Sequence, residues 1–487
     1  MSDGSGTTTA SILESCAGGV VTGAGRLGGD ALATTIDELA AQLRAAGAAG
    51  GPVCYLPPPG AAGALAFLAA SHVGAAAPVH PKITADELAA YLKTLDPDVL
   101  VVPAGSDLGE VAAAGTGVAT WMEHDGALRL EGQVGSTASS EAPGPDDVAL
   151  ILPTSGTTGD PKQVPLAHRQ LCRSAVDIAR SLQLGGDDTA LTMMPLFHIH
   201  GLVAGLLAPL AAGGWVAPEP FDAFRFGSYL DRHRPTWFSA VPTMHALIVE
   251  RWGDRRDELM TNQLRFARSS SSSLQPPLLH RIEAALGVPA VEAYGMTEAS
   301  HQITSNPIEP GERRPGSVGR STGLEVRIDR PDDEGRGEVL IRGPQVTAGY
   351  RHNDEANTSA FTDGWFRTGD EGRLDGEWLE LTGRLKEMIN RGGEKISPIE
   401  VELSLIGLEG VRRCAAFPAQ HDRLGEEVAA VVVLDRPGDL DASEVRTRLQ
   451  GKLAPHKIPR TVVVVDEIPL GPTGKVQRSR LAEQLGL

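Results

Sequence analysis

A run of small polar residues interrupted by glycine is the first part of the chain whose composition suggests chemistry. The segment TSGTTGDPK, residues 154–162, directly follows the apolar stretch 148–152, which is predicted to be a buried strand. Glycines let backbone N–H groups turn inward, hydroxyls add donors, and Lys162 supplies positive charge, so the segment suits a polyphosphate. It is not a Walker loop, because its glycines are three residues apart and a proline precedes the lysine. By composition alone it is equally compatible with a surface loop.

Charge and length limit the partners of the chain. Its 487 residues include 44 Lys and Arg against 62 Asp and Glu, a formal net charge of −18, and 41 % are hydrophobic. The length predicts about two to four folding units with ample material for a buried core. The negative charge argues against nucleic acid or an anionic membrane surface as the main partner. An anionic ligand must therefore be held by a local cluster of donors.

The cysteines and the ends of the chain indicate a cytoplasmic protein. No C-x-x-C pair occurs among the four widely separated cysteines, which excludes a cysteine zinc cluster and suits a reducing compartment. We expect no secretory signal, because the first basic residue is Arg26, and no C-terminal retention or peroxisomal address. The uncharged stretch 191–218 is interrupted by proline, glycine and histidine, so it is predicted to be a buried helix and not a membrane span.

Short apolar strands alternate with longer helices in the N-terminal part. Strands are predicted at 53–56 and 99–102, an Ala-rich helix at 61–73, and an amphipathic helix capped by Thr34 or Thr35. This alternation is the α/β pattern. From residue 319 to 341, period-two alternation predicts a small antiparallel β-rich subdomain.

A compact C-terminal unit follows residue 384. Helices are predicted at 397–408 and 443–453, and strands at 412–417, 428–434 and 461–465. About 100 residues suffice for an independent α+β domain.

Together with four later motifs, the polar loop resembles the signature loop of the adenylate-forming superfamily, which includes acyl-CoA synthetases, luciferases and the adenylation domains of peptide synthetases. In the family's order the motifs are EAYGMTE at 292–298, GWFRTGD at 364–370, GRLKE with RGGEKI at 383–396, and PLGPTGK at 469–475. Because all five motifs match in the same order, we no longer interpret residues 154–162 as an ordinary surface loop. It implies a large N-terminal ATP- and acid-binding domain at 1–382, of αβ layers with a β-rich subdomain. A hinge at 383–387 and a mobile α+β lid at 388–487 would follow.

The resemblance implies a role for each motif residue. ATP and Mg²⁺ would be bound, and CoA would be the co-substrate whose thiol attacks the acyl-adenylate in the second step. The phosphates of ATP would be held by Thr154, Ser155, Gly156, Thr157, Thr158, Gly159 and Lys162. Ala293 and Tyr294 would flank the adenine, Thr297 would bond the α-phosphate, and Glu298 would coordinate Mg²⁺. Asp370 would accept both ribose hydroxyls, with Arg384 close by.

The C-terminal motifs are implied to exchange places between two half-reactions. Lys475 would stabilise the adenylation transition state, Lys386 would be the hinge residue, and Gly392 and Gly393 would lie in the loop that replaces the lysine for thioester formation. One departure from the family pattern is Leu470, where a basic residue is usual.

The acid pocket is predicted to be polar. Arg268 precedes five serines, 269–273, where relatives for apolar acids carry a Gly/Ala-rich loop. A fatty chain would leave such hydroxyls unpaired, so we expect a small polar acid. Residues 297–306 and 390–400 are similar to those of oxalyl-CoA synthetases, which implies an oxalate-like acid. Its contacts would then come from His198, Ser270, Ser271 and His301.

Several alternatives stay open at this point. The first 120 residues match that subfamily only loosely, and an adenylating enzyme that transfers to an amine or a carrier protein, or that activates nitrite for N–N bond formation, would use a similar anion pocket. A catalytically silent homologue is a further alternative, against which intact Lys162, Glu298, Asp370 and Lys475 speak. His198 and His200, two residues apart without a third ligand, are a weak zinc signature. The acid, the acceptor and the oligomeric state do not follow from the sequence.

Overall fold

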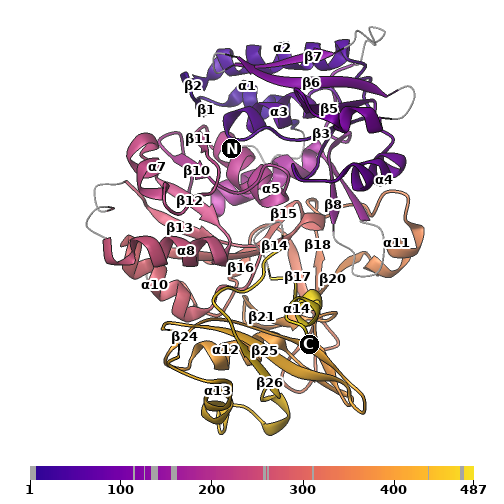
Figure 1. Ribbon diagram of the computed structural model, residues 1–487. Coiled ribbons are helices and arrows are strands. Elements are labelled where there is room, and N and C mark those ends of the chain that lie inside the picture. Colours follow the sequence, from indigo (N-terminus) through magenta and orange to yellow (C-terminus); the bar gives the residue numbers. More distant parts are fainter. Residues whose placement is uncertain are drawn as a thin grey trace.

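The computed structural model describes residues 7–112, 116–124, 127–132, 141–154, 162–255, 259, 263–309, 312–436, 438–471 and 476–487. Within these residues the chain forms four β-sheets, with helices packed against them (Figure 1). Two large sheets lie in the N-terminal part, and two smaller ones follow along the chain. The predicted α/β class, with a β-rich subdomain and an α+β C-terminal part, is confirmed.

A seven-stranded sheet occupies the N-terminal end, drawn in indigo and purple at the top of Figure 1. Its order is β7 (Ala127–Gly132), β6 (Gly117–His124), β5 (Val99–Pro103), β3 (Pro52–Tyr55), β4 (Ala75–Pro78), β8 (Val148–Thr154) and β9 (Lys162–Ala167). The inner strands are parallel, and β7 and β9 are antiparallel edges. Helices α2 (Gly29–Ala45) and α3 (Ala61–Ser71) share a core with one face, while α4 (Ala85–Leu95) packs on the other.

The predicted start of α2 was wrong. The helix begins at Gly29, not near Thr35, and its N-cap is Gly28. Thr34 and Thr35 lie inside it, where their hydroxyls donate to the carbonyl oxygens of Asp30 and Ala31 at 2.8 and 2.9 Å. A threonine that bonds back to the preceding turn is tolerated within a helix, so neither acts as the cap.

A nine-stranded sheet forms the middle of the molecule. Six of its strands are parallel neighbours: β1 (Gly19–Thr22), β11 (Trp215–Pro218), β10 (Thr189–Thr192), β12 (Trp237–Ala240), β13 (Phe266–Ser269) and β14 (Ala290–Met296). Antiparallel strands complete both edges, with β2 (Gly25–Gly28) at one and β15 (His301–Ser305) and β16 (Arg320–Ser321) at the other. The helices α5 (His168–Ser181), α7 (Phe226–His233), α8 (Pro242–Trp252) and α10 (Pro276–Leu286) lie in this part of the chain. Because the inner strands are parallel, their carboxyl ends meet along one edge.

The uncharged stretch 191–218 contains a buried helical segment, as predicted. The π-helix η2 (His200–Leu207) buries all eight of its residues and continues into α6 (Ala208–Ala211). Short π-helical turns are rare and frequent at functional sites. None of the helices in the described ranges has the length and apolar content needed to cross a bilayer.

Two smaller sheets complete the fold. The first is antiparallel and comprises β17 (Glu325–Asp329), β18 (Gly337–Arg342), β19 (Phe361–Thr362), β20 (Trp365–Asp375) and β21 (Trp378–Arg384), as the alternation predicted. The C-terminal sheet comprises β22 (Ile389–Arg391), β23 (Glu394–Ile396), β24 (Val411–His421), β25 (Gly425–Leu434) and β26 (Thr461–Val464). It packs with α12 (Pro398–Ile406), α13 (Ala442–Leu449) and α14 (Arg478–Gln484), which confirms the predicted α+β unit. The exact division at 382 and 388 stays a prediction.

One carboxyl group is buried within the nine-stranded sheet. Glu292 of β14 is 3 % exposed, and its Oε1 accepts a hydrogen bond from the backbone N–H of Leu274 at 2.9 Å. Burial raises the pKa of Glu292 to about 8, and the hydrogen bond opposes this only in part. The carboxyl group is therefore mostly protonated at neutral pH, and it fixes the residue that follows the serine run.

This group makes folding depend on pH. The folded carboxyl takes up its proton near pH 8, against an ordinary value of 4.5, so the folded state binds more protons between these values. The free energy of unfolding must then fall as pH rises through the window, by at most about 1.4 kcal/mol per pH unit. Glu292→Gln keeps the acceptor without the titration, so we expect it to gain stability over the wild type as pH rises. Urea unfolding across this window measures the difference, and identical slopes in both proteins would contradict the assignment.

Candidate active site

The candidate site lies where the parallel strands of the nine-stranded sheet end. His200 begins η2 in the connection after β10, Ser239 lies in β12, and Arg268 lies at the end of β13. Thr297 and Glu298 follow β14 directly in the short 3-10 helix η4 (Thr297–Ala299). Ligands in open α/β sheets bind at this edge, because successive loops leave the sheet there side by side.

A hydrogen-bonded trio joins this edge to the antiparallel sheet. The hydroxyl of Tyr294 donates to Asp370 Oδ2 at 2.6 Å, and Arg384 Nε donates to Asp370 Oδ1 at 2.8 Å. Asp370 and Arg384 are cross-strand partners in β20 and β21, which accounts for their contact. Burial, then the charge of Asp370, raises the pKa of Tyr294 well above its ordinary value, and the same carboxylate raises the pKa of Arg384. The carboxylate is thus balanced by one cation, and each oxygen has a second lone pair for a ligand.

A second group surrounds Glu298. Its side chain is buried, and Tyr350 donates its hydroxyl hydrogen to Glu298 Oε1 at 3.0 Å. Lys162 Nζ lies 4.5 Å from the centroid of the Tyr350 ring, a cation–π contact. Burial raises the pKa of Glu298, while the bond from Tyr350 lowers it. Tyr350 thereby contacts both Lys162 and the carboxyl group of Glu298, which lies just beyond β14.

The two ends of the polar loop are fixed by strand pairing. Thr154 and Lys162 face each other in β8 and β9, and Thr154 Oγ1 lies 3.4 Å from the Lys162 carbonyl oxygen. Ala293 and Tyr294 are buried in β14, and Thr297 is half-buried just beyond it. The remaining predicted phosphate ligands and the catalytic lysine lie outside the described residues: Ser155, Gly156, Thr157, Thr158, Gly159 and Lys475.

Arg268 is the centre of a third polar network at this edge of the sheet, among the residues predicted to contact the acid. The residue is 0 % exposed, and burial lowers the pKa of its guanidinium to about 9. Its Nη1 lies 3.1 Å from Ser239 Oγ and 3.2 Å from His200 Nε2. Its Nη2 lies 3.1 Å from His301 Nε2 and 2.8 Å from Gln302 Oε1. Among the described residues no carboxylate pairs with this buried cation.

Two imidazole rings stack in front of the guanidinium. The centroids of His200 and His301 are 4.8 Å apart with 21° between the planes, and His200 Nδ1 lies 3.0 Å from Ser271 Oγ. Ser271, Ser300 and His301 have φ angles of 72°, 51° and 96°, which L-residues rarely adopt. Such strain persists only where surrounding contacts over-determine it, and it concentrates at functional sites.

The structure changes the list of acid-side residues. His200, which the sequence suggested only as part of a weak zinc signature, contacts Ser271, whereas His198 Nδ1 accepts from the backbone N–H of His200 at 3.2 Å. Ser270 is buried, and its hydroxyl has no hydrogen-bond partner among the residues that the structure describes. From the sequence alone we assigned no role to Arg268 or to its partners Ser239 and Gln302. The available signal was an arginine inside the otherwise apolar and small strand FARS, where an unpaired charge is costly.

The predicted hinge and thioester-loop residues lie around the C-terminal sheet. Lys386 lies between β21 and β22, and Gly392 and Gly393 form the two-residue turn between β22 and β23. Both glycines have positive φ, 60° and 98°, which such a turn requires. Arg478 donates to Glu387 Oε2 at 2.9 Å and to Glu402, and thus ties α14 to the segment beside Lys386.

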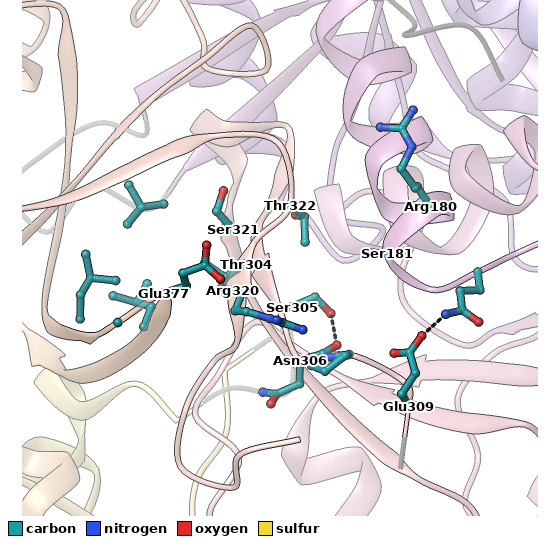
Figure 2. A pocket seen from close by; sticks show the side chains of 16 residues that line it. Arg180, Ser181, Thr304, Ser305, Asn306, Glu309, Arg320, Ser321, Thr322 and Glu377 are labelled. Carbon is teal, nitrogen blue, oxygen red and sulfur yellow. Dashed lines mark hydrogen bonds between the residues drawn. The ribbon is translucent and has the colours of Figure 1, made fainter. Parts of the chain in front are cut away.

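A polar cavity of about 650 Å³ lies next to the site, between the end of α5 and strands β15 and β16 (Figure 2). None of the predicted ATP or acid residues lines it. Its walls include Ser181 and Thr322, whose hydroxyls accept hydrogen bonds from Gln302 Nε2 at 3.0 and 3.1 Å. The Arg268 network therefore ends at the wall of this cavity.

Comparison with known families decides the affiliation of the chain. The model of the AMP-binding enzyme family matches residues 20–351, and that of the AMP-binding enzyme C-terminal domain matches residues 400–475. The chain belongs to the AMP-binding enzyme family. The two matches cover both large sheets and most of the C-terminal sheet described above.

Relatives with assigned activities narrow the class of this AMP-binding enzyme. It is 39 % identical to a probable CoA ligase, CCL9, of Humulus lupulus over 470 residues, covering 92 % of this chain and 89 % of the relative. It is 39 % identical to the oxalate–CoA ligase of Arabidopsis thaliana over 427 residues, 84 % and 83 % of the two chains. It is 38 % identical to the sulfoacetate–CoA ligase of Cupriavidus necator over 347 residues, 70 % and 67 %.

Solved structures agree along nearly the whole chain. The ATP-bound MatB from Rhodopseudomonas palustris superposes with a TM-score of 0.87 at 28 % identity, covering 98 % of this chain and 99 % of that one. The o-succinylbenzoate CoA synthetase MenE from Bacillus subtilis, in complex with ATP and magnesium ion, gives 0.80 at 26 %, covering 95 % and 96 %. The AMP-binding enzyme described here is an AMP-forming acid–CoA ligase, which activates a carboxylic acid through an acyl-adenylate.

Gly295 sets the position of His301 in this ligase. The ladder of β14 and β15 is irregular between Tyr294 and Gly295, and a Cβ added to Gly295 would lie 1.5 Å from the carbonyl oxygen of His301. We expect Gly295→Ala to lower the free energy of unfolding by at least about 2 kcal/mol, because backbone must move. We also expect loss of acid activation. Urea unfolding and pyrophosphate release measure the two effects.

Gly23→Ala is the matched control for that experiment. A Cβ added to the exposed Gly23 would meet nothing within 4 Å, so its unfolding free energy and activity should stay close to those of the wild type. A Gly295→Ala protein as stable and active as this control would show that the close approach is not required.

Proposed function

We propose that this acid–CoA ligase activates a small acid bearing a second negatively charged group, as oxalate does, and transfers the acyl group to CoA. The observation that carries the proposal is the buried guanidinium of Arg268, which has no carboxylate partner among the described residues. A buried charge is costly unless an opposite charge accompanies it. A substrate anion bound beside the network would supply that charge.

The lining of the acid side supports a polar substrate over a fatty one. It presents imidazoles and hydroxyls, including the unpartnered buried hydroxyl of Ser270. An alkyl chain would leave these groups without water or partners, at a cost of about 1–3 kcal/mol for each. Oxalate and sulfoacetate, which the two named relatives activate, both carry two acidic groups. We assign the contacts with the acid to His198, Ser270, Ser271 and His301, and we add His200.

The opposite end of the site suits the nucleotide. We propose that the Asp370 carboxylate accepts the two ribose hydroxyls, that Ala293 and Tyr294 flank the adenine, and that Thr297 bonds the α-phosphate. The phosphate loop, 154–162, would hold the β- and γ-phosphates, with Arg384 nearby. Glu298 fits Mg²⁺, because a buried carboxylate beside phosphate oxygens offers the hard oxygen ligands that this ion prefers. When bound, the ion would neutralise phosphate charge.

The chemistry then proceeds in two balanced steps. An oxygen of the acid attacks the α-phosphorus of ATP, and pyrophosphate leaves with the electron pair of the broken P–O bond. The sulfur of CoA next attacks the acyl carbon, AMP leaves, and the thiol proton passes to solvent. We propose that Lys475 serves the first step and that the Gly392–Gly393 turn replaces it for the second, by rotation about Lys386.

A panel of acids tests the proposed substrate class. Pyrophosphate release is measured with oxalate, sulfoacetate, acetate, hexanoate and nitrite, with and without CoA. We expect kcat/KM for at least one acid with two anionic groups to exceed that for hexanoate by at least about 100-fold, because only the former pairs with the lining. AMP and the acyl-CoA should form in equal amounts.

The other outcomes are equally informative. A preference for hexanoate or acetate would overturn the substrate class. Release with nitrite and with none of the acids, at the same rate with and without CoA, would favour the N–N-forming alternative. No release with any substrate would contradict enzyme activity itself.

Lys475→Ala tests the exchange of residues between the two steps. We expect adenylation to fall by at least about 100-fold, because the cation that faces the transition state is lost, while thioester formation from supplied acyl-adenylate stays within about threefold of the wild type. Lys452→Ala, at an exposed lysine of the same C-terminal part, is the control and should leave both rates unchanged. Equal losses in both half-reactions of the Lys475→Ala protein would rule out the exchange.

A further inference from the structure

We infer that Arg268 is a positioning residue that acts on the acid through His200 and His301. It holds both rings in the neutral form with the proton on Nδ1, so that the Nδ1–H of His301 and the hydroxyl of Ser271, which accepts from His200, serve the second anionic group of the acid beside a positive charge. This inference rests on the proposed function, because it explains how a doubly anionic substrate would be recognised.

The terminal nitrogens of Arg268 are fully used within the protein. A guanidinium carries four N–H hydrogens on its two terminal nitrogens and accepts none. Four acceptors surround them: Ser239 Oγ at 3.1 Å, His200 Nε2 at 3.2 Å, His301 Nε2 at 3.1 Å and Gln302 Oε1 at 2.8 Å. No terminal N–H is left for a substrate oxygen, so the influence of the terminal nitrogens passes through these partners. The Nε–H is buried without a partner among the described residues, and it is the one donor of Arg268 left for a direct contact.

The same bonds fix the protons of both rings. Because Arg268 can only donate, each Nε2 must accept, and a neutral imidazole then carries its hydrogen on Nδ1. The hydroxyl of Ser239, which accepts from Arg268, directs its own hydrogen to His200 Nε2 at 2.6 Å. His200 Nδ1–H then donates to Ser271 Oγ at 3.0 Å. Ring stacking at 4.8 Å also favours neutral imidazoles, since two imidazolium ions beside a guanidinium would repel.

Gln302 holds the guanidinium from behind. Its Oε1 accepts from Arg268, so its amide NH₂ must point away, and it donates to Ser181 Oγ and Thr322 Oγ1. Both hydroxyls belong to the wall of the cavity in Figure 2. The plane of the guanidinium, and with it the positions of both rings, is thereby anchored in α5 and in the segment after β16.

Because no carboxylate among the described residues balances Arg268, we expect the network to favour dianionic over monoanionic acids. The reacting carboxylate of the acid loses its charge on becoming an acyl-adenylate, whereas the second anionic group keeps its charge throughout. A monoanionic acid would leave Arg268 uncompensated once adenylated, and a dianionic acid would not. Removing the guanidinium should therefore weaken binding of the dianionic acid far more than that of a monoanionic one.

The test compares oxalate with its monoanionic analogue glyoxylate, by pyrophosphate release in the wild type, Arg268→Met and Arg268→Lys. We expect Arg268→Met to lower the ratio of kcat/KM for oxalate over that for glyoxylate by at least about 30-fold, mainly through KM, with KM for ATP unchanged. Arg268→Lys keeps the charge but cannot reach four acceptors from one nitrogen, so it should restore the ratio only in part. An unchanged ratio in Arg268→Met, or full restoration by lysine, would overturn the inference.

Arg265→Met is the matched control. Arg265 lies directly before β13 and pairs with Asp188 at 2.6 Å, away from the network, so its removal tests a general loss of stability in the same region. We expect its substrate ratio to equal that of the wild type. In a His200→Ala/His301→Ala background, Arg268→Met should cause little further change in the ratio, because the route to the acid is already gone. An undiminished effect there would show that Arg268 reaches the acid by another route.

A measurement on the wild-type protein covers the case in which Arg268→Met does not fold. Nitrogen-15 NMR of histidine-labelled enzyme, with His200→Gln and His301→Gln for assignment, should show Nδ1 protonated and Nε2 unprotonated in both rings; the opposite tautomer in either would overturn the inference. The outcomes also separate the two proposals. A wild type without preference for dianionic acids contradicts the proposed function. A preference that survives unchanged in Arg268→Met contradicts only the role of Arg268.

Discussion

A buried guanidinium, Arg268, that has no carboxylate partner among the described residues is the constraint on which the proposed acid site of this ligase depends. Removing such a group from water costs several kcal/mol, so it persists only where hydrogen bonds replace those lost. Arg268 obtains them from four residues on η2, β12 and β15. That arrangement in turn requires the positive φ of His301 and the close approach of Gly295. The hydrogen bonds that hold the Arg268 guanidinium therefore coincide with a strained backbone at His301.

The two arginines of the site, Arg384 and Arg268, differ in whether a carboxylate balances their charge. Arg384 faces Asp370 across a strand pair, so its charge is balanced before any ligand binds. Arg268 has no such partner among the described residues, which leaves its charge for the acid that we propose to bind there. In a chain of net charge −18, this local imbalance is what can draw in a dianion. For the nucleotide, by contrast, we propose the Asp370 carboxylate as the partner of the ribose and Lys162 as a partner of the phosphates.

Most of the fold could be predicted from the sequence, because its elements carry their own periodicity. The strands at 53–56 and 99–102 and the buried helix within 191–218 needed only local apolar patterns. The start of α2 could not, because the hydroxyls of Thr34 and Thr35 bond within the helix as readily as at its end. The residues that we propose for the nucleotide come from contiguous motifs. The acid-side network was not predicted, since no local pattern joins Arg268 to His200 or Gln302.

This difference follows from how each side is assembled. We propose one loop, 154–162, for the phosphates and one strand pair, β20 and β21, for the ribose. The residues for each group are therefore neighbours in the sequence. The residues that we propose around the acid come from the ends of several strands, between positions 200 and 302 of the chain, and only the order of the sheet brings them together. Each can change without disturbing the nucleotide motifs, which lets one scaffold accept different acids. The lone arginine in strand FARS is therefore the kind of signal to seek in such chains: a charge that a sheet core would not tolerate unless a ligand used it.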